Sequence, residues 1–295
     1  MHKGKTMKNI GYYNGEFGPI EQMRVPMEDR AVYFGDGVYD VTYAVNHILV
    51  AVDDHLDRFY RSLGKLKIPF AMERGELART LQQMVDKVDD SGSLQVYWQA
   101  SRGTGLRNHV FPEGGVPANL MIMITPEPLT PIRQRFRAVT VEDTRFFHCD
   151  IKTLNLIPNV MAAQKAKEAG CDEAIFHRGF IVTECAHSNV SILKDGVFRT
   201  APLSNLILPG TARKHLVALA EQEGIPVDQT AFTVEEMMDA DEVVFHSSGT
   251  LCNAFDEIDG KKVGGRAPEL LKKLQDAAVH QIEADTKVSF SDYAE

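Results

Sequence analysis

Three prolines within nine residues, in the segment PEPLTPIRQ, divide the sequence into two halves. Proline cannot donate a backbone hydrogen bond to a sheet and disfavours helical backbone in the residue before it, so this cluster predicts a linker. We expect a smaller N-terminal α/β domain over residues 1–126, the linker over 127–133, and a larger C-terminal domain over 134–295. A chain of 295 residues is long enough for two such domains.

Strand and helix patterns alternate irregularly in both halves. The first half predicts a hairpin around Asn14-Gly15, two strands that break at Asn46, and then an amphipathic helix capped by Asp53 or Asp54. Further strands are expected at 94–100, 119–125, 136–142, around Lys152, and at 173–176, 180–183, 190–193 and 242–248; further helices are expected at 74–88, 160–170, 212–222 and 268–284. Because strict strand–helix–strand alternation is missing, the predicted fold class is α/β in the mixed, α+β sense.

Composition and charge exclude several classes of protein. The formal charge is −9 with acids and bases interspersed, which argues against a general nucleic-acid binder. The longest apolar run, Leu120 to Ile124, is too short to cross a membrane, and the N-terminus lacks the apolar stretch of a secretory signal. The four cysteines show no CxxC spacing and the histidines no metal-ligand spacing. We therefore expect a cytoplasmic protein with no metal and no nucleic-acid or membrane partner.

Lys152 interrupts an apolar run in the segment CDIKTLNL, which alternates like a half-buried strand. A partly buried amine is easier to keep uncharged than one in water, and an uncharged amine can attack an aldehyde to form a Schiff base. The alternative is an ordinary lysine at a strand end, with its amine in water. The neighbouring motifs favour the chemical interpretation.

Glu184, in VTECAHSN, follows apolar strand residues and precedes small or polar ones. A carboxylate buried there needs a partner, for example the protonated nitrogen of a pyridine ring, although a solvent-facing carboxylate remains the alternative. Two turns, LPGTARKHL and HSSGTL, combine glycine with hydroxyl residues. In the first, Gly210 and Thr211 open a helix, whose free N–H groups favour an anion. Each turn, taken singly, is equally consistent with a simple cap.

Three basic side chains are candidates for binding anionic groups. Arg58 lies on the amphipathic helix and is a candidate for a phosphate, unless it only faces solvent. Arg107 and His109 stand two residues apart in the polar loop SRGTGLRNHVFPEGG, so in an extended segment they point the same way. Two donors on one side form a trap for a carboxylate; the alternative is a flexible loop that happens to contain them.

Seven segments in this order resemble the fold-type IV family of pyridoxal-phosphate enzymes and, within it, the D-amino-acid aminotransferases: EDRAVYFGDGVYDV, HLDRFYRS, RGTGLRNHVFP, CDIKTLNL, TECAHSN, LPGTAR and EIDGK. The resemblance runs from about Gly11 to Gly265. It implies a two-domain fold with pyridoxal 5'-phosphate between the domains, a homodimer, and ping-pong transfer of an amino group between a D-amino acid such as D-alanine and a 2-oxo acid, 2-oxoglutarate or pyruvate.

The resemblance also assigns roles to individual residues. Lys152 is the catalytic lysine that holds the cofactor as a Schiff base, and Glu184 pairs with the ring nitrogen. Cofactor contacts are further implied for Arg58, Leu208, Gly210, Thr211, Ala212, Ser248 and Gly249, and substrate contacts for Tyr39, Arg107 and His109. The sequence departs from the family pattern at Ala186 and His187, which interrupt a stretch that is usually small and hydroxyl-rich, and at Ala212 and Gly249, which lack the hydroxyl groups that often help to bind phosphate. The alternatives are transamination of (R)-amines or branched-chain L-amino acids, and an aminodeoxychorismate lyase-like activity.

Overall fold

The computed structural model describes residues 7–90 and 92–289. The chain forms two compact units, the first containing Met1–Pro128 and Ile151–Asn155, the second Leu129–Asp150 and Leu156–Glu295. The change of unit after Pro128 lies inside the expected linker. A division into two continuous halves does not anticipate the return of Ile151–Asn155 to the first unit, because nothing in that short segment marks its partner.

A six-stranded antiparallel sheet forms the first unit, with strand order β2-β1-β6-β5-β3-β4. Its strands are β1 (Ile10–Tyr13), β2 (Glu16–Gly18), β3 (Gly37–Val45), β4 (Ile48–Leu49), β5 (Ser93–Ser101) and β6 (Asn119–Pro126). Its helices are η1 (Ile20–Gln22), α1 (Arg30–Phe34), α2 (Val52–Leu66) and α3 (Arg74–Val85). The expected hairpin is present, with Asn14 and Gly15 both at positive φ, as a tight two-residue turn requires.

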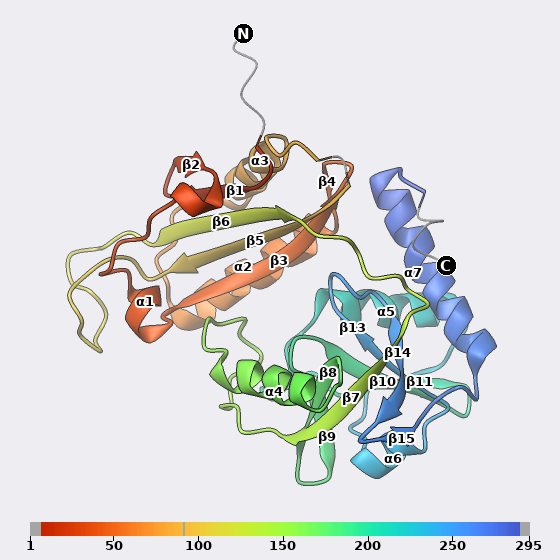
Figure 1. Cartoon of the computed structure of the whole chain (residues 1–295). Helices are drawn as coiled ribbons and strands as arrows, with labels where there is room; N and C mark the ends of the chain where they lie inside the picture. The colour runs from red at the N-terminus through yellow and green to blue at the C-terminus, as the bar shows by residue number, and fades with distance from the viewer. Residues whose placement is uncertain (1–6, 91, 290–295) are drawn as a thin grey trace. The chain divides into compact units, whose positions relative to one another are not determined.

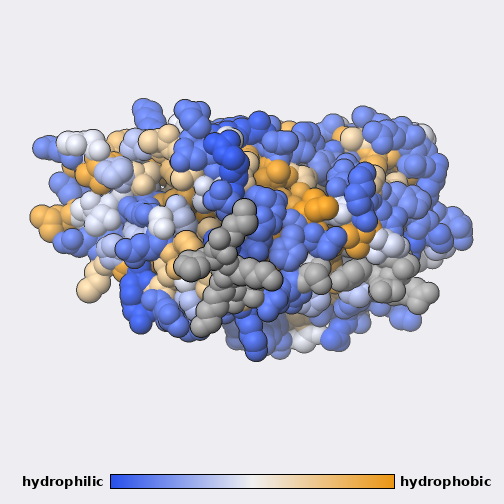
Figure 2. Space-filling view, turned by 90° about the horizontal axis from the view of Figure 1, so that it is seen from above, coloured by the Kyte–Doolittle hydropathy of each residue, from blue (hydrophilic) through white to orange (hydrophobic). Residues whose placement is uncertain are grey.

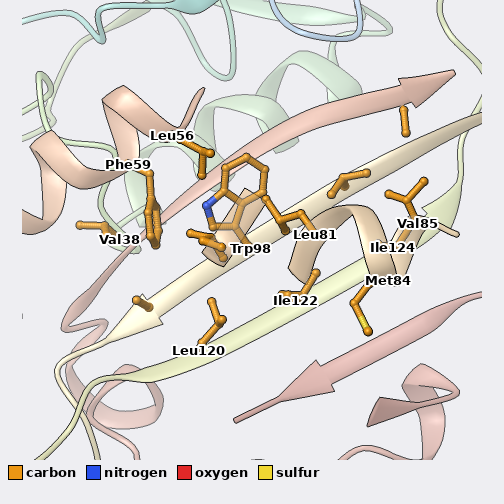
Figure 3. Packing of buried hydrophobic residues seen from close by; sticks show 14 of the residues in the cluster. Val38, Leu56, Phe59, Leu81, Met84, Val85, Trp98, Leu120, Ile122 and Ile124 are labelled. Carbon is orange, nitrogen blue, oxygen red and sulfur yellow. The ribbon is translucent and has the colours of Figure 1, made fainter. Parts of the chain in front are cut away.

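The core of the first unit lies between its sheet and the helices α2 and α3. Alternate residues of β5 point toward the helices, so Val96 and Trp98 are fully buried. Phe59 of α2 and Leu81 of α3 pack in the same cluster, as Figure 3 shows. On the neighbouring strand β3 the same alternation buries Asp40, a carboxylate on the core side of the sheet.

A nine-stranded mixed sheet forms the second unit, in the order β12-β11-β10-β13-β14-β7-β8-β9, with β15 paired to β14 (Figure 1). Its strands are β7 (Arg135–Glu142), β8 (Glu173–Arg178), β9 (Ile181–Cys185), β10 (Asn189–Lys194), β11 (Val197–Thr200), β12 (Val227–Asp228), β13 (Glu242–His246), β14 (Asn253–Ile258) and β15 (Lys261–Lys262). Its helices are α4 (Ile157–Glu168), α5 (Thr211–Gln222), α6 (Val234–Met238) and α7 (Pro268–Thr286). Each unit combines a sheet with helices, and the second sheet is mixed, which confirms the predicted fold class.

Two local predictions are wrong. Ala51, at φ 47°, precedes α2 in the N-cap position, and neither Asp53 nor Asp54 caps the helix, since both lie inside its first turn. The segment around Lys152 is not a strand: it makes a single isolated bridge, between Thr153 and Val38. Helices α1 and α6 were not expected, because five residues are too few to show a helical period.

The surface carries no sign of a membrane-spanning element. No helix within residues 7–90 and 92–289 combines the length and the apolar composition that a bilayer span needs. On the face drawn in Figure 2, hydrophilic residues predominate and hydrophobic residues form smaller areas among them. Such scattered apolar surface is ordinary for a globular protein.

Candidate active site

Lys152 is held by its main chain against strand β3 of the first unit. Its carbonyl oxygen accepts a hydrogen bond of 2.9 Å from the Tyr39 amide, and its own amide donates to Ser62 Oγ at 3.3 Å. Two residues further, Leu154 donates to the Gly37 carbonyl at 3.1 Å. A Cβ atom on Gly37 would lie 2.7 Å from the Leu154 side chain, so glycine is what lets this segment approach the strand.

The amine of Lys152 faces an aromatic ring. Its Nζ atom lies 4.3 Å from the ring centre of Tyr39, within the range of a cation–π contact. Tyr39 in turn stacks on Tyr97, with ring centres 5.5 Å apart. The structure therefore brings together Lys152 and Tyr39, two of the residues selected from the sequence.

A buried polar cluster lies close to this pair on the core side of β3. Asp40 accepts hydrogen bonds from Arg58 Nε at 2.9 Å and Arg58 Nη2 at 2.6 Å, a two-pronged ion pair. His55 Nδ1 lies 2.8 Å from Asp40 Oδ1. Burial alone would raise the pKa of Asp40, but the charge of Arg58 and the hydrogen bonds from His55 and Arg58 outweigh it and hold this pKa well below its ordinary value.

The pKa of His55 is lowered in this cluster. Burial lowers its pKa and outweighs the opposing effect of Asp40, and the charges of Arg58 and Lys152 lower it further. Because the Nδ1 atom faces a carboxylate, we assign the proton of the neutral imidazole to Nδ1, from which it forms a hydrogen bond to Asp40. Arg58, selected from the sequence as a phosphate ligand, is thus fixed by Asp40 near Lys152 and Tyr39; its contact with a phosphate stays a prediction.

Arg107 and His109 meet at a single aromatic ring, that of Phe34. The Arg107 guanidinium lies 5.0 Å from the centre of this ring, and the centre of the His109 imidazole also lies 5.0 Å from it. Both basic side chains are exposed. Both side chains therefore contact Phe34, at the end of α1, a residue that the sequence did not reveal; their contact with a carboxylate stays a prediction.

Glu184, on β9 of the second unit, is buried and surrounded by donors. One of its carboxylate oxygens pairs with Arg145 Nη1, and the other accepts hydrogen bonds of 2.9 Å from Asn189 Nδ2 and from the Leu208 amide. Arg145 also binds Asp143. Burial would raise the pKa of Asp143, but Arg145 and Arg178 hold this pKa below its ordinary value. Arg145, Asn189 and the Leu208 amide are all hydrogen-bond donors, which favour a charged carboxylate. A partner for a protonated ring nitrogen must carry this charge.

The segment that follows Leu208 leads into helix α5, as expected. Gly210 is the N-cap residue, and Thr211 and Ala212 begin the helix. A Cβ atom on Gly210 would lie 2.0 Å from Asn189 Oδ1, so this close approach requires glycine. Asn189 therefore connects Glu184 with the start of α5, where backbone N–H groups point outward.

The second glycine-containing turn lies at the same end of the sheet. Asn189 pairs with His246, the last residue of β13, and Ser248 and Gly249 follow directly. Within this turn, Ser247 Oγ and Thr250 Oγ1 are 2.8 Å apart and Ser247 Oγ also lies 3.4 Å from the Gly249 amide. The structure thus groups Glu184, Leu208, Gly210 and Thr211 around Asn189, with the turn after β13 beside them.

The departures Ala186 and His187 have a local structural role. Ala186 is buried, and its carbonyl accepts a hydrogen bond from Asn159. The exposed His187 places Nδ1 at 3.2 Å from Oε2 of the buried Glu173. Burial raises the pKa of Glu173, and the charge of His187 opposes that shift. His187 therefore contacts Glu173, whereas its neighbour Glu184 contacts Arg145.

Four buried polar residues of these clusters were missed in the sequence: Asp40, His55, Arg145 and Asn189. A signal existed for two of them. Asp40 occupies an apolar position in the alternation of β3, and His55 precedes Arg58 by three residues, on the same side of α2. Arg145 and Asn189 lie outside such patterns, because their partners come from distant segments.

Comparisons with known proteins agree with this geometry. A model of the family described as amino-transferase class IV matches residues 37–258. D-alanine aminotransferase of Staphylococcus haemolyticus is 37% identical over 276 residues, which cover 92% of this chain and 98% of that protein. D-alanine aminotransferase of Listeria monocytogenes is 36% identical, over 89% of this chain and 92% of its own.

Solved structures show the same fold at lower identity. The branched-chain aminotransferase of Thermoproteus uzoniensis superposes with a TM-score of 0.84 at 23% identity, covering 96% of each chain. That of Escherichia coli has a TM-score of 0.85 at 20% identity, over 97% of this chain and 98% of its own. The family match and the relatives, over most of the chain, show that this protein is an aminotransferase. The chain belongs to the class IV aminotransferase family, and its cofactor is pyridoxal 5'-phosphate.

The donor groups present fit this cofactor chemically. The first unit carries an amine, Lys152 Nζ, which suits an aldehyde. The second carries a buried carboxylate, Glu184, which suits a protonated pyridine nitrogen, and the outward N–H groups of α5 behind Gly210, which suit a phosphate. Each of the three reactive or charged parts of the cofactor thus has a matching group in the chain.

Proposed function

We propose that this enzyme transfers an amino group between a D-amino acid, such as D-alanine, and a 2-oxo acid, 2-oxoglutarate or pyruvate, by ping-pong kinetics. Support comes from relatives that share 35–38% identity over most of the chain and are D-alanine aminotransferases. The observation that carries the proposal is the anchoring of Lys152, whose amide and carbonyl are both hydrogen-bonded while its amine faces Tyr39.

The chain's own groups divide the work. Pyridoxal 5'-phosphate, when bound, supplies an electron sink for the charge left after loss of the substrate's α-proton. Lys152 Nζ would hold the cofactor through its aldehyde carbon and, when free, would move a proton between the substrate's α-carbon and the cofactor carbon. Glu184, which Arg145 holds in place by an ion pair, would accept a hydrogen bond from the protonated ring nitrogen. The further cofactor contacts that we propose are Arg58, Leu208, Gly210, Thr211, Ala212, Ser248 and Gly249.

The substrate's carboxylate is held by Arg107 and His109, with Tyr39 beside the reacting carbon. The contact that both basic groups make with the Phe34 ring supports this assignment. Holding the carboxylate at a fixed position relative to Lys152 selects which face of the α-carbon loses its proton. This is the basis on which we propose D-specificity, against transamination of (R)-amines or branched-chain L-amino acids.

A donor panel tests the function. D-alanine, L-leucine and (R)-1-phenylethylamine are each offered with pyruvate or 2-oxoglutarate, and the chirality of the new amino acid is determined. We expect turnover with D-alanine and a D-configured product, and loss of turnover in Lys152→Ala. The matched control is Lys165→Ala, on the exposed side of α4, which should keep full activity. Turnover with L-leucine alone, or release of pyruvate without any acceptor from an aminodeoxychorismate-like substrate, would contradict the proposal.

We further propose that the enzyme is a homodimer in the cytoplasm. The charge balance and the absence of CxxC spacing are compatible with a reducing compartment. Sedimentation equilibrium at micromolar concentration tests the assembly. A mass near twice 32.9 kDa is expected, and a single-chain mass at all concentrations would contradict it.

A further inference from the structure

Arg213, in the first turn of α5, carries a buried positive charge. Its side chain is 4% exposed. Arg213 Nη2 donates to the Ala201 carbonyl at 2.8 Å and to Gln229 Oε1 at 2.9 Å, both neutral acceptors, whereas Nε has no partner. No carboxylate within residues 7–90 and 92–289 forms an ion pair with it. A buried charge is ordinarily paired, so this one requires an explanation.

His246, on which the charge of Arg213 acts, does not compensate this charge. His246 is fully buried at the end of β13, and its Nε2 atom lies 2.9 Å from Ser191 Oγ. Burial, and then the charge of Arg213, lower the pKa of His246 to about 3, so the imidazole is neutral at physiological pH. Its Nδ1 atom has no hydrogen-bond partner either. Arg213 therefore binds only neutral acceptors, and the imidazole on which its charge acts is neutral as well.

The position of this charge links it to the start of α5. The Cβ atom of Arg213 lies 3.5 Å from the place that a Cβ on Gly210 would occupy. Gly210 contacts Asn189, which pairs with His246 in the sheet. Glu184, the carboxylate bonded to Asn189, is already paired with Arg145. Arg213 thus lies in the first turn of a helix whose N-terminus already carries a partial positive charge, and its guanidinium charge acts on His246, the sheet partner of Asn189.

We propose that Arg213 is a positioning residue of the cofactor site, whose charge is balanced by the phosphate group that binds at the start of α5. This inference rests on the proposed cofactor contacts of Gly210, Thr211 and Ala212. It also explains how the phosphate is held although Ala212 and Gly249 lack hydroxyl groups. In a poorly hydrated interior one charge several ångströms away still contributes strongly, because the effective dielectric is far below that of water.

Gln229 offers a test that leaves Arg213 in place. Gln229→Glu changes only an amide to a carboxylate of the same shape, at hydrogen-bond distance from Nη2 of Arg213. The new carboxylate becomes the partner that the phosphate otherwise provides. Its matched control is Gln222→Glu, which adds the same charge at the exposed far end of α5.

The readout is the affinity of the cofactor-free full-length protein for pyridoxal 5'-phosphate and for pyridoxal, which lacks the phosphate. For Gln229→Glu we expect the affinity for pyridoxal 5'-phosphate to fall about tenfold, which is the size of one partly screened charge interaction. The affinity for pyridoxal should change less than about twofold, because it has no phosphate charge. Arg213→Gln should behave likewise, and Arg213→Met replaces it if the glutamine variant does not fold. Arg213→Lys, which keeps the charge, should preserve most of the preference for pyridoxal 5'-phosphate over pyridoxal. Gln222→Glu should preserve all of this preference.

Inorganic phosphate provides a second probe. It should raise the melting temperature of the cofactor-free wild type, and do so much less in Gln229→Glu. An unchanged preference for the phosphorylated cofactor in both Gln229→Glu and the neutral Arg213 variants would overturn the inference, as would equal weakening of both cofactors, which indicates a purely structural role. A wild type that binds both forms equally would refute the cofactor contacts themselves. None of these readouts depends on turnover of a D-amino acid.

Discussion

Asp40 holds Arg58 through both of its carboxylate oxygens, at 2.9 and 2.6 Å, with neither side chain more than 6% exposed. The pair joins strand β3 to helix α2 directly behind Tyr39 and Lys152. Because burial makes each charge dependent on the other, this pair fixes the position of Arg58 in a way that a surface ion pair does not.

Asp40→Asn should therefore be strongly destabilising. It removes the buried carboxylate charge that Arg58 binds through two hydrogen bonds, and we expect the free energy of unfolding to fall by about 3 to 5 kcal/mol. Asp57→Asn, which removes an exposed partner of Arg74, is the control and should cost less than about 1 kcal/mol. Urea unfolding followed by tryptophan fluorescence measures both, since Trp98 lies in the same core. Equal effects of the two substitutions would contradict the role of the buried pair.

Because His246 has a lowered pKa in the folded protein, the free energy of unfolding should depend on pH. Burial, and then the charge of Arg213, hold its pKa at about 3, against an ordinary value of 6.5 in the unfolded chain. Below pH 6.5 the unfolded state therefore binds a proton that the folded state does not, and stability falls by up to about 1.4 kcal/mol per pH unit. This loss continues down to about pH 3.

Replacing His246 removes this contribution. His246→Gln should show a flatter fall in the free energy of unfolding between pH 6.5 and 5 than the wild type, measured by urea titrations at each pH. His280→Gln, on the exposed side of α7, is the control and should follow the wild-type curve. Parallel curves for His246→Gln and the wild type would show that His246 is not buried in its neutral form.

Much of the fold was accessible from the sequence. The strands β5 and β6 and the helices α3, α5 and α7 were placed within a few residues, since each has a clear period and most end at glycine, proline or polar residues. The bridge that joins Thr153 to Val38 was not, because the segment 151–155 pairs with a strand more than a hundred residues earlier. Such pairings depend on tertiary contacts that no local pattern encodes.

The candidate site divides in the same way. Lys152, Glu184 and Gly210 stand out because a charged residue or a glycine interrupts an apolar segment. Arg145, Asp40 and Arg213 do not, since an arginine or an aspartate is most often exposed, and its burial becomes visible only when the chain is folded.

Two glycines should respond in opposite directions to the same substitution. Gly210→Ala puts a methyl group 2.0 Å from Asn189 Oδ1, so it should displace Asn189 from Glu184 and weaken cofactor binding about tenfold or more. Gly64→Ala lies within α2 with open space around it, and should stabilise the protein by about 0.5 to 1 kcal/mol. Spectral titration with the cofactor and thermal melts separate the two effects. A Gly210→Ala enzyme with wild-type cofactor affinity would contradict the close approach seen here.

Phe34→Ala should affect substrate binding more than the chemical step. Without the ring, Arg107 and His109 lose their common contact, and we expect KM for D-alanine to rise about tenfold while kcat changes less than about threefold. Phe17→Ala, in the exposed β1–β2 hairpin, is the control. Initial-rate kinetics with a saturating 2-oxo acid measure both variants. A fall in kcat alone, with KM unchanged, would place Phe34 outside the carboxylate-binding group.

Borohydride reduction of the holoenzyme, followed by peptide mass mapping, tests the central role of Lys152 most directly. Reduction makes the bond between cofactor and amine permanent, so the modified peptide identifies the amine that attacked the aldehyde. We predict one phosphopyridoxyl adduct per chain, on Lys152 in the peptide that contains CDIKTLNL. An adduct on another lysine, or no adduct in a protein that shows the cofactor's absorbance, would contradict the account.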